Sequence, residues 1–185
     1  NAAGTFGLAG GVPGPVVALI HIPGFLTTQH AGHLHFMNDM VEIAKLPPDV
    51  SFRRVPVMFQ QRWQPLAKVY YALDALGVES KLSPDVFKAI HGQNVALWDD
   101  DKFYDWVATK GVDRNKAKEV FTSFAVDGKM KRAMQLAQQY NIQSVPTVVV
   151  DGKFVTSSDR VGTHAQLPAA IDELVNKARA ERPKG

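Results

Sequence analysis

The chemistry open to this chain is limited first by an absence, because its 185 residues include no cysteine. Disulfide exchange, thiolate nucleophiles and cysteine-bound metals are therefore outside what this polypeptide can do alone. The densest group of reactive side chains is a set of histidines, His30, His33 and His35, with His21 a short distance before them. Imidazoles three positions apart lie on adjacent turns of a helix and could bind zinc or copper.

Two observations disfavour such a metal site. His35 lies about 140° round a helix from His30, and no glutamate stands between His30 and His33 as it does in zinc metalloproteases. We therefore expect these histidines to face solvent or to form hydrogen bonds, and we expect neither a metal nor another cofactor. The sequence also has no glycine-rich phosphate loop and no Gly-x-Ser-x-Gly turn, and the acidic run from Asp99 to Asp101 indicates a helix start.

The composition is that of a folded globular protein. Hydrophobic residues make up 45% and charged residues 21% of the chain, which excludes collagen, a coiled coil and wholesale disorder. The net charge is +3, and the densest basic stretch is the tail with Lys177, Arg179, Arg182 and Lys184. No stacking aromatic side chains alternate with these residues, so we expect a solvated helix surface and no nucleic-acid partner.

The longest apolar stretch, from Val16 to Leu26, is interrupted by His21, Pro23 and Gly24. It is about half as long as a segment that spans a bilayer, so we expect no membrane insertion. The chain begins without a methionine or a basic, apolar leader. We therefore expect a mature or recombinant product from which any signal has been removed.

The elements that would position a site begin with a strand, a helix and a second strand. Residues 1–11 are rich in glycine and are expected to form a flexible lead-in. Residues 15–22 are a branched apolar run, residues 34–44 carry a helical apolar stripe, and residues 50–57 are a second strand. This order predicts a right-handed βαβ unit with parallel strands.

The apolar period then becomes helical for more than 70 residues from Trp63. Within this block Ser83 and Pro84 are expected to be the cap and first residue of a helix. The strand period returns at Thr147–Val150, followed by an Asp-Gly turn and a second strand over 153–156. A last helix is expected from near Leu167.

This element order predicts an α/β fold, thioredoxin-like, with an inserted helical domain. The thioredoxin-like domain is expected to be discontinuous, over residues 12–62 and 126–185, with the helical insert over 63–125. Other α+β folds share the same order, so the pattern alone leaves them open.

Several segments carry a resemblance to a known family, and they agree in order and spacing over roughly residues 46–157. They are Arg54-Val55-Pro56-Val57, Tyr70 to Gly77, Phe87 to His91, Lys110 to Arg114, Ser123 to Val126 and Ser144 to Thr147. Together they resemble the DsbA family of periplasmic thiol:disulfide oxidoreductases. The resemblance implies disulfide transfer to newly exported polypeptides, a location in the periplasm and reoxidation by a membrane partner of the DsbB kind.

The resemblance also implies a binding role for Val145, Pro146 and Thr147. In the family this proline is cis and faces the redox centre, and the backbone beside it pairs with an extended substrate. The alternative is an ordinary trans proline at the start of a strand. The surrounding Tyr140-Asn141-Ile142 and the Asp-Gly turn favour the cis form.

The chain departs from the family where the family carries Cys-x-x-Cys. The missing pair falls near Gln29 and Gly32, or near His30 and His33 if the helix is one residue shorter. The chain could be a natural or engineered redox-inactive member, or residues 18–44 could be a corrupted stretch of sequence, or the histidines could have replaced the cysteines. We expect no dithiol oxidation or reduction. The alternative function is a binding module that holds unfolded or extended polypeptides in a groove beside Pro146.

Overall fold

The computed structural model describes residues 16–21, 49–58 and 61–181. Its described residues group into two units. The first contains 16–21, 49–55 and 140–181, and the second contains 56–58 and 61–139. The expected lead-in and the expected helix over 34–44 lie outside the described residues.

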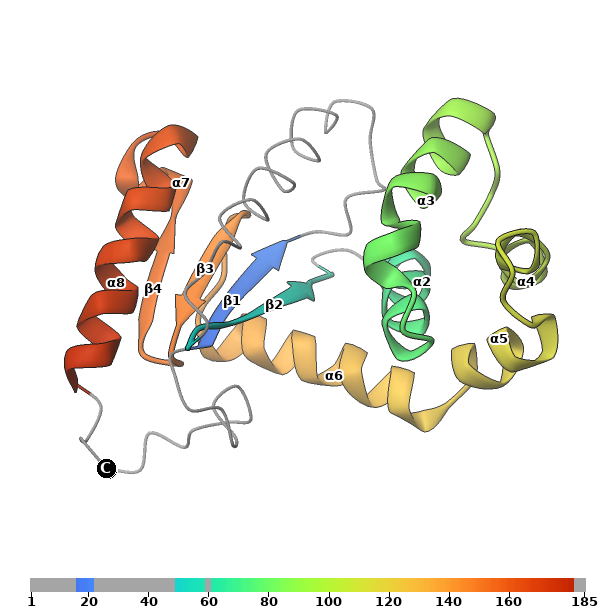
Figure 1. Ribbon diagram of the computed structural model, residues 1–185, viewed down its shortest axis with the longest axis horizontal. Helices are drawn as coiled ribbons and strands as arrows, with labels where there is room; N and C mark the ends of the chain where they lie inside the picture. Colours follow the sequence, from blue (N-terminus) through green and yellow to red (C-terminus); the bar gives the residue numbers. More distant parts are fainter. Residues whose placement is uncertain (1–15, 22–48, 59–60, 182–185) are drawn as a thin grey trace. The chain divides into compact units, whose positions relative to one another are not determined.

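A four-stranded sheet belongs to the first unit, with the order β2-β1-β3-β4. The strands are β1 (Val16–His21), β2 (Ser51–Pro56), β3 (Thr147–Val150) and β4 (Phe154–Ser157). Strand β3 is antiparallel to both β1 and β4, whereas the arrows of β1 and β2 point the same way in Figure 1. The two N-terminal strands are therefore adjacent and parallel, as the βαβ pattern predicts.

The hairpin between β3 and β4 turns through Asp151 and Gly152. Their φ angles are 54° and 69°, the left-handed region that an Asp-Gly pair enters most readily. The N–H of Lys153 donates to the carbonyl of Val150 at 3.0 Å and closes the turn. Strand β4 consequently begins at Phe154, one residue later than the sequence predicts.

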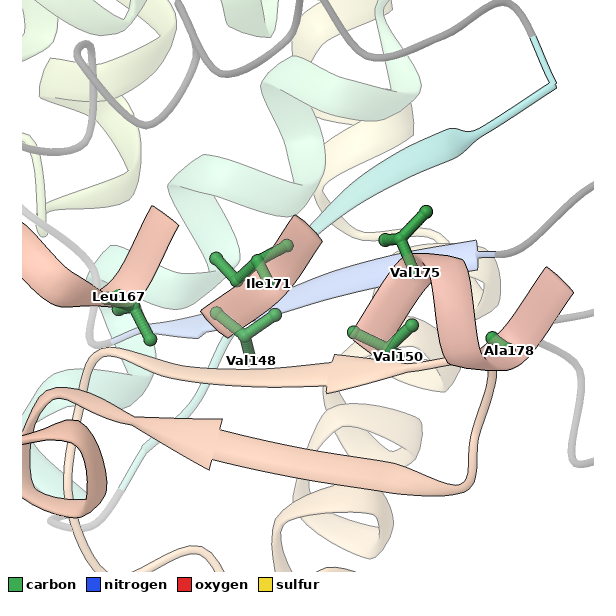
Figure 2. Packing of buried hydrophobic residues seen from close by; sticks show 6 residues of the cluster. All are labelled: Val148, Val150, Leu167, Ile171, Val175 and Ala178. Atoms are coloured by element: carbon green, nitrogen blue, oxygen red, sulfur yellow. The ribbon is translucent and has the colours of Figure 1, made fainter. Parts of the chain in front are cut away.

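Helix α8 (Leu167–Glu181) covers one face of this hairpin. Its buried stripe, Leu167, Ile171, Val175 and Ala178, packs against Val148 and Val150, as Figure 2 shows. The stripe spacing places all four side chains on one face of the helix, and alternation places both valines on one face of the strand. Helix α8 therefore holds β3 from the face to which its even-numbered residues point.

The basic residues of α8 contact the rest of this unit. The Nε and Nη2 groups of Arg179 each donate to the Asp49 carboxylate at 2.8 Å, and Lys177 Nζ lies 4.8 Å from the ring centroid of Phe154. The hydrogen bond to Asp49 also raises the pKa of the Arg179 guanidinium. These described members of the basic tail pair with their own fold.

The second unit is helical. After a short 3-10 turn, η2 (Gln61–Trp63), it consists of α2 (Gln64–Ala75), α3 (Glu79–Gln93), α4 (Asp100–Ala108), α5 (Arg114–Phe121) and α6 (Phe124–Gln139). Helix α2 is central, because α3, α5 and α6 all pack against it. None of the described helices is long and apolar enough to cross a membrane.

Three aromatic side chains fill the end of this helical unit. The ring centroids of Phe103 and Phe121 lie 5.0 Å apart, and those of Tyr104 and Phe121, which pack edge-on, lie 5.5 Å apart. Phe103 is fully buried, and Phe121 is only 1% exposed. Offset and edge-on contacts of this kind add to the stabilisation that burial itself provides. They fix α4 against α5.

The predicted start of α3 at Ser83 and Pro84 is wrong. The helix begins at Glu79, and Pro84 lies inside it. A full turn precedes the proline, because the N–H of Leu82 donates to Val78 and buried Leu82 anchors that turn. The Ser83 hydroxyl donates to the Glu79 carboxylate at 2.7 Å instead of capping the helix.

The acidic run does begin a helix. Asp99 is the N-cap of α4, and its carboxylate accepts from the N–H of Lys102 at 3.1 Å. Asp101 and Asp105 both accept hydrogen bonds from Arg114. These carboxylates therefore satisfy backbone and side-chain donors of the helical unit.

Grouping by contacts places α6 with the helices. The sequence predicts a helical insert over 63–125 and assigns α6 to the thioredoxin-like domain. Those boundaries stay a prediction.

Candidate functional site

The positions at which the family carries its dithiol lie outside the described residues. This applies to Gln29, His30, Gly32 and His33, and also to His35. The two alternative registers of the missing pair therefore stay predictions. Within the ranges that the structure describes, no three histidine, aspartate or glutamate residues are grouped as metal ligands would be.

The predicted binding residues Val145, Pro146 and Thr147 lie where the chain enters β3. The peptide bond between Val145 and Pro146 is cis. Val145 is half-buried, Pro146 is buried, and Thr147 is 4% exposed as the first residue of the strand. The three residues thus lie together at one end of the sheet.

Thr147 fixes the geometry of this entry. Its hydroxyl donates to the carbonyl of Ser144 at 2.6 Å, which bridges the two sides of the Val145–Pro146 bond. Its backbone is in register with Ile20 of β1 and with Ser157 of β4. Thr147 is therefore held by strands on both sides, and the residues just before it are held through its side chain.

The backbone of Val145 takes no part in the ladder. The pairing of β1 with β3 ends at Ile20 and Thr147, and no other hydrogen bond within the described part of the chain uses the Val145 N–H or carbonyl. Peptide groups pair with another partner or with water wherever they can. This residue therefore presents one donor and one acceptor beside a sheet that holds its neighbours in place.

A cavity of about 360 Å³ opens next to this segment. It lies between the 140–144 segment and β4, and the following residues line it: Tyr140, Asn141, Ile142, Gln143, Ser144, Thr147, Val155, Ser157, Asp159 and Arg160. Because Phe154 packs with the α8 cluster, alternation points Val155 and Ser157 to the other face of the sheet. The cavity is therefore on the face away from α8.

Local backbone geometry forms the wall of the cavity. Asn141 has a φ of 48°, which turns the chain sharply just after α6 ends. The Tyr140 hydroxyl donates to the carbonyl of Gly152 at 3.3 Å and ties the wall to the hairpin turn. A Cβ atom at position 152 would lie 3.3 Å from that hydroxyl, so glycine fits both the backbone angle and the space.

Opposite charges lie at the mouth of the cavity. Asp159 and Arg160 are both exposed, and Arg160 donates to the carbonyl of Val155 at 3.1 Å. One carboxylate and one guanidinium add no net charge. The polarity of the cavity therefore comes mainly from neutral hydroxyl and amide groups.

The sequence predicts the proline segment as a binding site, whereas it does not predict the cavity. Ser157 and Tyr140 line it, and neither type of residue suggests a site by itself. The alternation of the hairpin could have placed Thr147, Val155 and Ser157 on one face. The turn at Asn141 that brings Tyr140 to the same place has no comparable signal.

The sheet order, the parallel β1 and β2, the antiparallel hairpin and the closing helix define a thioredoxin-like fold with a helical insertion. The description "DSBA-like thioredoxin domain" belongs to a family model that matches residues 23–167. The chain therefore belongs to the DSBA-like thioredoxin domain family.

Relatives and solved structures agree with this assignment. The chain is 37% identical over 138 residues to the thiol:disulfide interchange protein DsbA of Pseudomonas syringae pv. tomato, covering 75% of this chain and 64% of that relative. It is 34% identical over 140 residues to the DsbA of Burkholderia cepacia, covering 76% and 66%. The matched region thus spans just under two thirds of the length of these relatives.

The crystal structure of Pseudomonas aeruginosa DsbA superposes with a TM-score of 0.79 at 31% identity, covering 91% of this chain and 85% of that one. DsbA from Xylella fastidiosa superposes with a TM-score of 0.77 at 26% identity, covering 91% and 88%. The relatives are named for thiol:disulfide interchange, a reaction that requires cysteine, and this chain has no cysteine.

Proposed function

We propose that this chain binds extended polypeptides and does not exchange disulfides. Binding takes place by backbone pairing at Val145, beside Pro146 and Thr147. The observation that carries the proposal is the Val145 peptide unit, whose N–H and carbonyl have no partner among the described residues.

Backbone pairing at such a position is a known mode of peptide recognition. An extended segment that adds to an unpaired strand gains main-chain hydrogen bonds, and neighbouring pockets select its side chains. The entry to β3 suits this role because Thr147 is fixed by its bond to Ser144 and by both adjacent strands. A fixed partner strand loses little conformational entropy when the peptide binds.

The redox part of the proposal follows from composition. Disulfide exchange requires a thiolate that attacks a disulfide sulfur, and neither imidazole nor hydroxyl can take that role. We expect no turnover in an insulin-reduction assay. Turnover by a chain whose intact mass matches the cysteine-free sequence would contradict redox inactivity, and such a matching mass would itself exclude a corrupted sequence.

Restoring the cysteines tests whether their absence alone accounts for inactivity. The two registers give two double variants, Gln29→Cys with Gly32→Cys and His30→Cys with His33→Cys. We expect one of them to reduce insulin, and the active one identifies the register. Inactivity of both would mean that this chain has lost more than its dithiol.

We further infer a location in the bacterial periplasm and unfolded exported polypeptides as partners, because the resemblance to the DsbA family implies both. A membrane oxidase of the DsbB kind, which the resemblance also implies, has no dithiol to reoxidise in this chain. Fractionation of the native host, followed by immunoblotting, tests the location. Recovery in the cytoplasmic fraction alone would contradict it.

Two substitutions at one position test the binding mode. Val145→Pro removes the N–H that would pair with the peptide, whereas Val145→Ala keeps both backbone groups and shortens the side chain. The probe is a lysine-flanked peptide of alternating threonine and valine, which favours an extended conformation. Calorimetry should show affinity about five-fold or more weaker for Val145→Pro, the effect of one lost hydrogen bond.

We expect Val145→Ala to bind nearly as well as the unchanged chain. Circular dichroism and the urea midpoint of both variants establish that they fold. If the peptide does not bind the unchanged chain, the proposed function is overturned. If Val145→Pro binds the peptide equally well, backbone pairing at Val145 is contradicted.

A further inference from the structure

We propose that the cavity beside the 140–144 segment is a specificity pocket for a neutral, hydrogen-bonding side chain, such as glutamine or asparagine, of the bound polypeptide. This inference rests on the proposed function, because it concerns the same peptide. Backbone pairing at Val145 does not distinguish one peptide side chain from another, whereas the pocket would select one of them.

The cavity lies next to Val145, where the peptide is proposed to pair. Ser144 immediately precedes Val145, and Thr147 follows two residues later, and both line the cavity. Side chains of a paired strand alternate between the two faces of the sheet at about 3.3 Å per residue. A peptide paired at Val145 would therefore send every second side chain toward the face on which the cavity lies.

An unused hydroxyl inside the cavity carries the second step. Ser157 is only 4% exposed, and its hydroxyl makes no hydrogen bond within the described part of the chain. Ser157 is one of the residues that line the cavity. The Ser157 hydroxyl is therefore accessible through the cavity that it lines.

The remaining polar groups define the chemistry of the side chain. Asn141 and Gln143 supply amides, and the Gln143 amide already reaches Asn141 at a long 3.4 Å. Thr147 uses its hydroxyl proton on Ser144 and can still accept a hydrogen bond. The cavity thus offers donors and acceptors together, and a primary amide, which has both, matches this set better than an ion does.

Size and charge agree with this choice. A volume of about 360 Å³ lies at the small end of the range for ligand pockets, enough for one side chain with its flanking backbone. Asp159 and Arg160 at the mouth are of opposite sign, so a charged side chain gains little there. A neutral polar side chain avoids the cost of desolvating a charge.

The test compares glutamine with alanine at each position of the threonine–valine host peptide. We expect one position at which glutamine improves affinity about five-fold, the effect of one added hydrogen bond. Ser157→Ala should reduce that preference and leave the affinity for the alanine peptide unchanged. Thr156→Val is the matched control, because Thr156 is its buried neighbour on the same strand and points to the opposite face; its preference should be that of the unchanged chain.

The outcomes separate this proposal from the proposed function. Equal affinity for glutamine and alanine at every position, together with weaker binding by Val145→Pro, would overturn the pocket and leave backbone pairing intact. A preference that survives in Ser157→Ala would also overturn it. Failure of every peptide to bind the unchanged chain would overturn both proposals.

Discussion

Ile171 is the residue through which α8 holds the strand that carries the proposed site. It is 1% exposed and lies among Val148, Val150 and Val175 in the cluster of Figure 2. Ile171→Ala removes three carbon atoms from this cluster. At about 0.8 kcal/mol per buried methylene, the lost transfer free energy is about 2.4 kcal/mol.

The space left behind adds to this loss, because β3 and α8 are each held by other contacts and cannot fully close it. The expected decrease in the free energy of unfolding is therefore about 3–4 kcal/mol, within the range for buried isoleucine replaced by alanine. Ile171→Val, which removes one methylene, should cost about 0.5–1.5 kcal/mol. Glu173→Ala, on the exposed side of the same helix, should stay within about 0.5 kcal/mol.

Urea titrations followed by circular dichroism measure these differences, provided that the dependence of the free energy on urea is unchanged. A loss below about 1 kcal/mol for Ile171→Ala would refute the packing of α8 on β3. Equal losses for Ile171→Ala and Glu173→Ala would refute the assignment of the buried face.

Three other substitutions test separate parts of the fold. Gly152→Ala should destabilise the hairpin by about 1–2 kcal/mol because alanine is strained at positive φ, and here its Cβ would also crowd Tyr140; an unchanged urea midpoint would contradict this. Phe121→Ala should cost about 3–5 kcal/mol, measured in the same way, and a loss near zero would contradict the aromatic cluster. The hydrogen bond from Lys110 holds the pKa of the Asp85 carboxyl below its ordinary value, so its stabilising contribution is present at neutral pH and lost as the pH falls through that lowered pKa. Asp85→Asn should therefore flatten the acid side of the stability profile, and urea midpoints that fall equally steeply in both proteins would contradict the ion pair.

The fold could be predicted where local pattern and packing agree. The stripe of α8 and the alternation of the hairpin each describe a face that must be buried, so both elements appear in the structure, with β4 shifted by one residue from its predicted position. Ser83 and Pro84 gave the wrong helix start, because a serine followed by proline can also lie inside a helix. Here the preceding turn is anchored by the buried side chain of Leu82.

The candidate site could be predicted only in part. The segment from Val145 to Thr147 is continuous, and its neighbours in the sequence identify it. The residues that line the cavity are not contiguous in the sequence. The left-handed turn at Asn141 and the pairing of β3 with β4 bring them together. No periodic pattern encodes that meeting, so the cavity appears only once the chain is folded.

The Val145 amide proton offers the most direct measurement of polypeptide binding. Its exchange with solvent can be followed by NMR with and without the threonine–valine peptide, because pairing withdraws the proton from water. We predict slower exchange and a shifted resonance at Val145 in the presence of the peptide, with the exchange of helical-unit amides such as Val107 unchanged. Exchange at Val145 that stays the same while the peptide is bound would contradict backbone pairing at this residue.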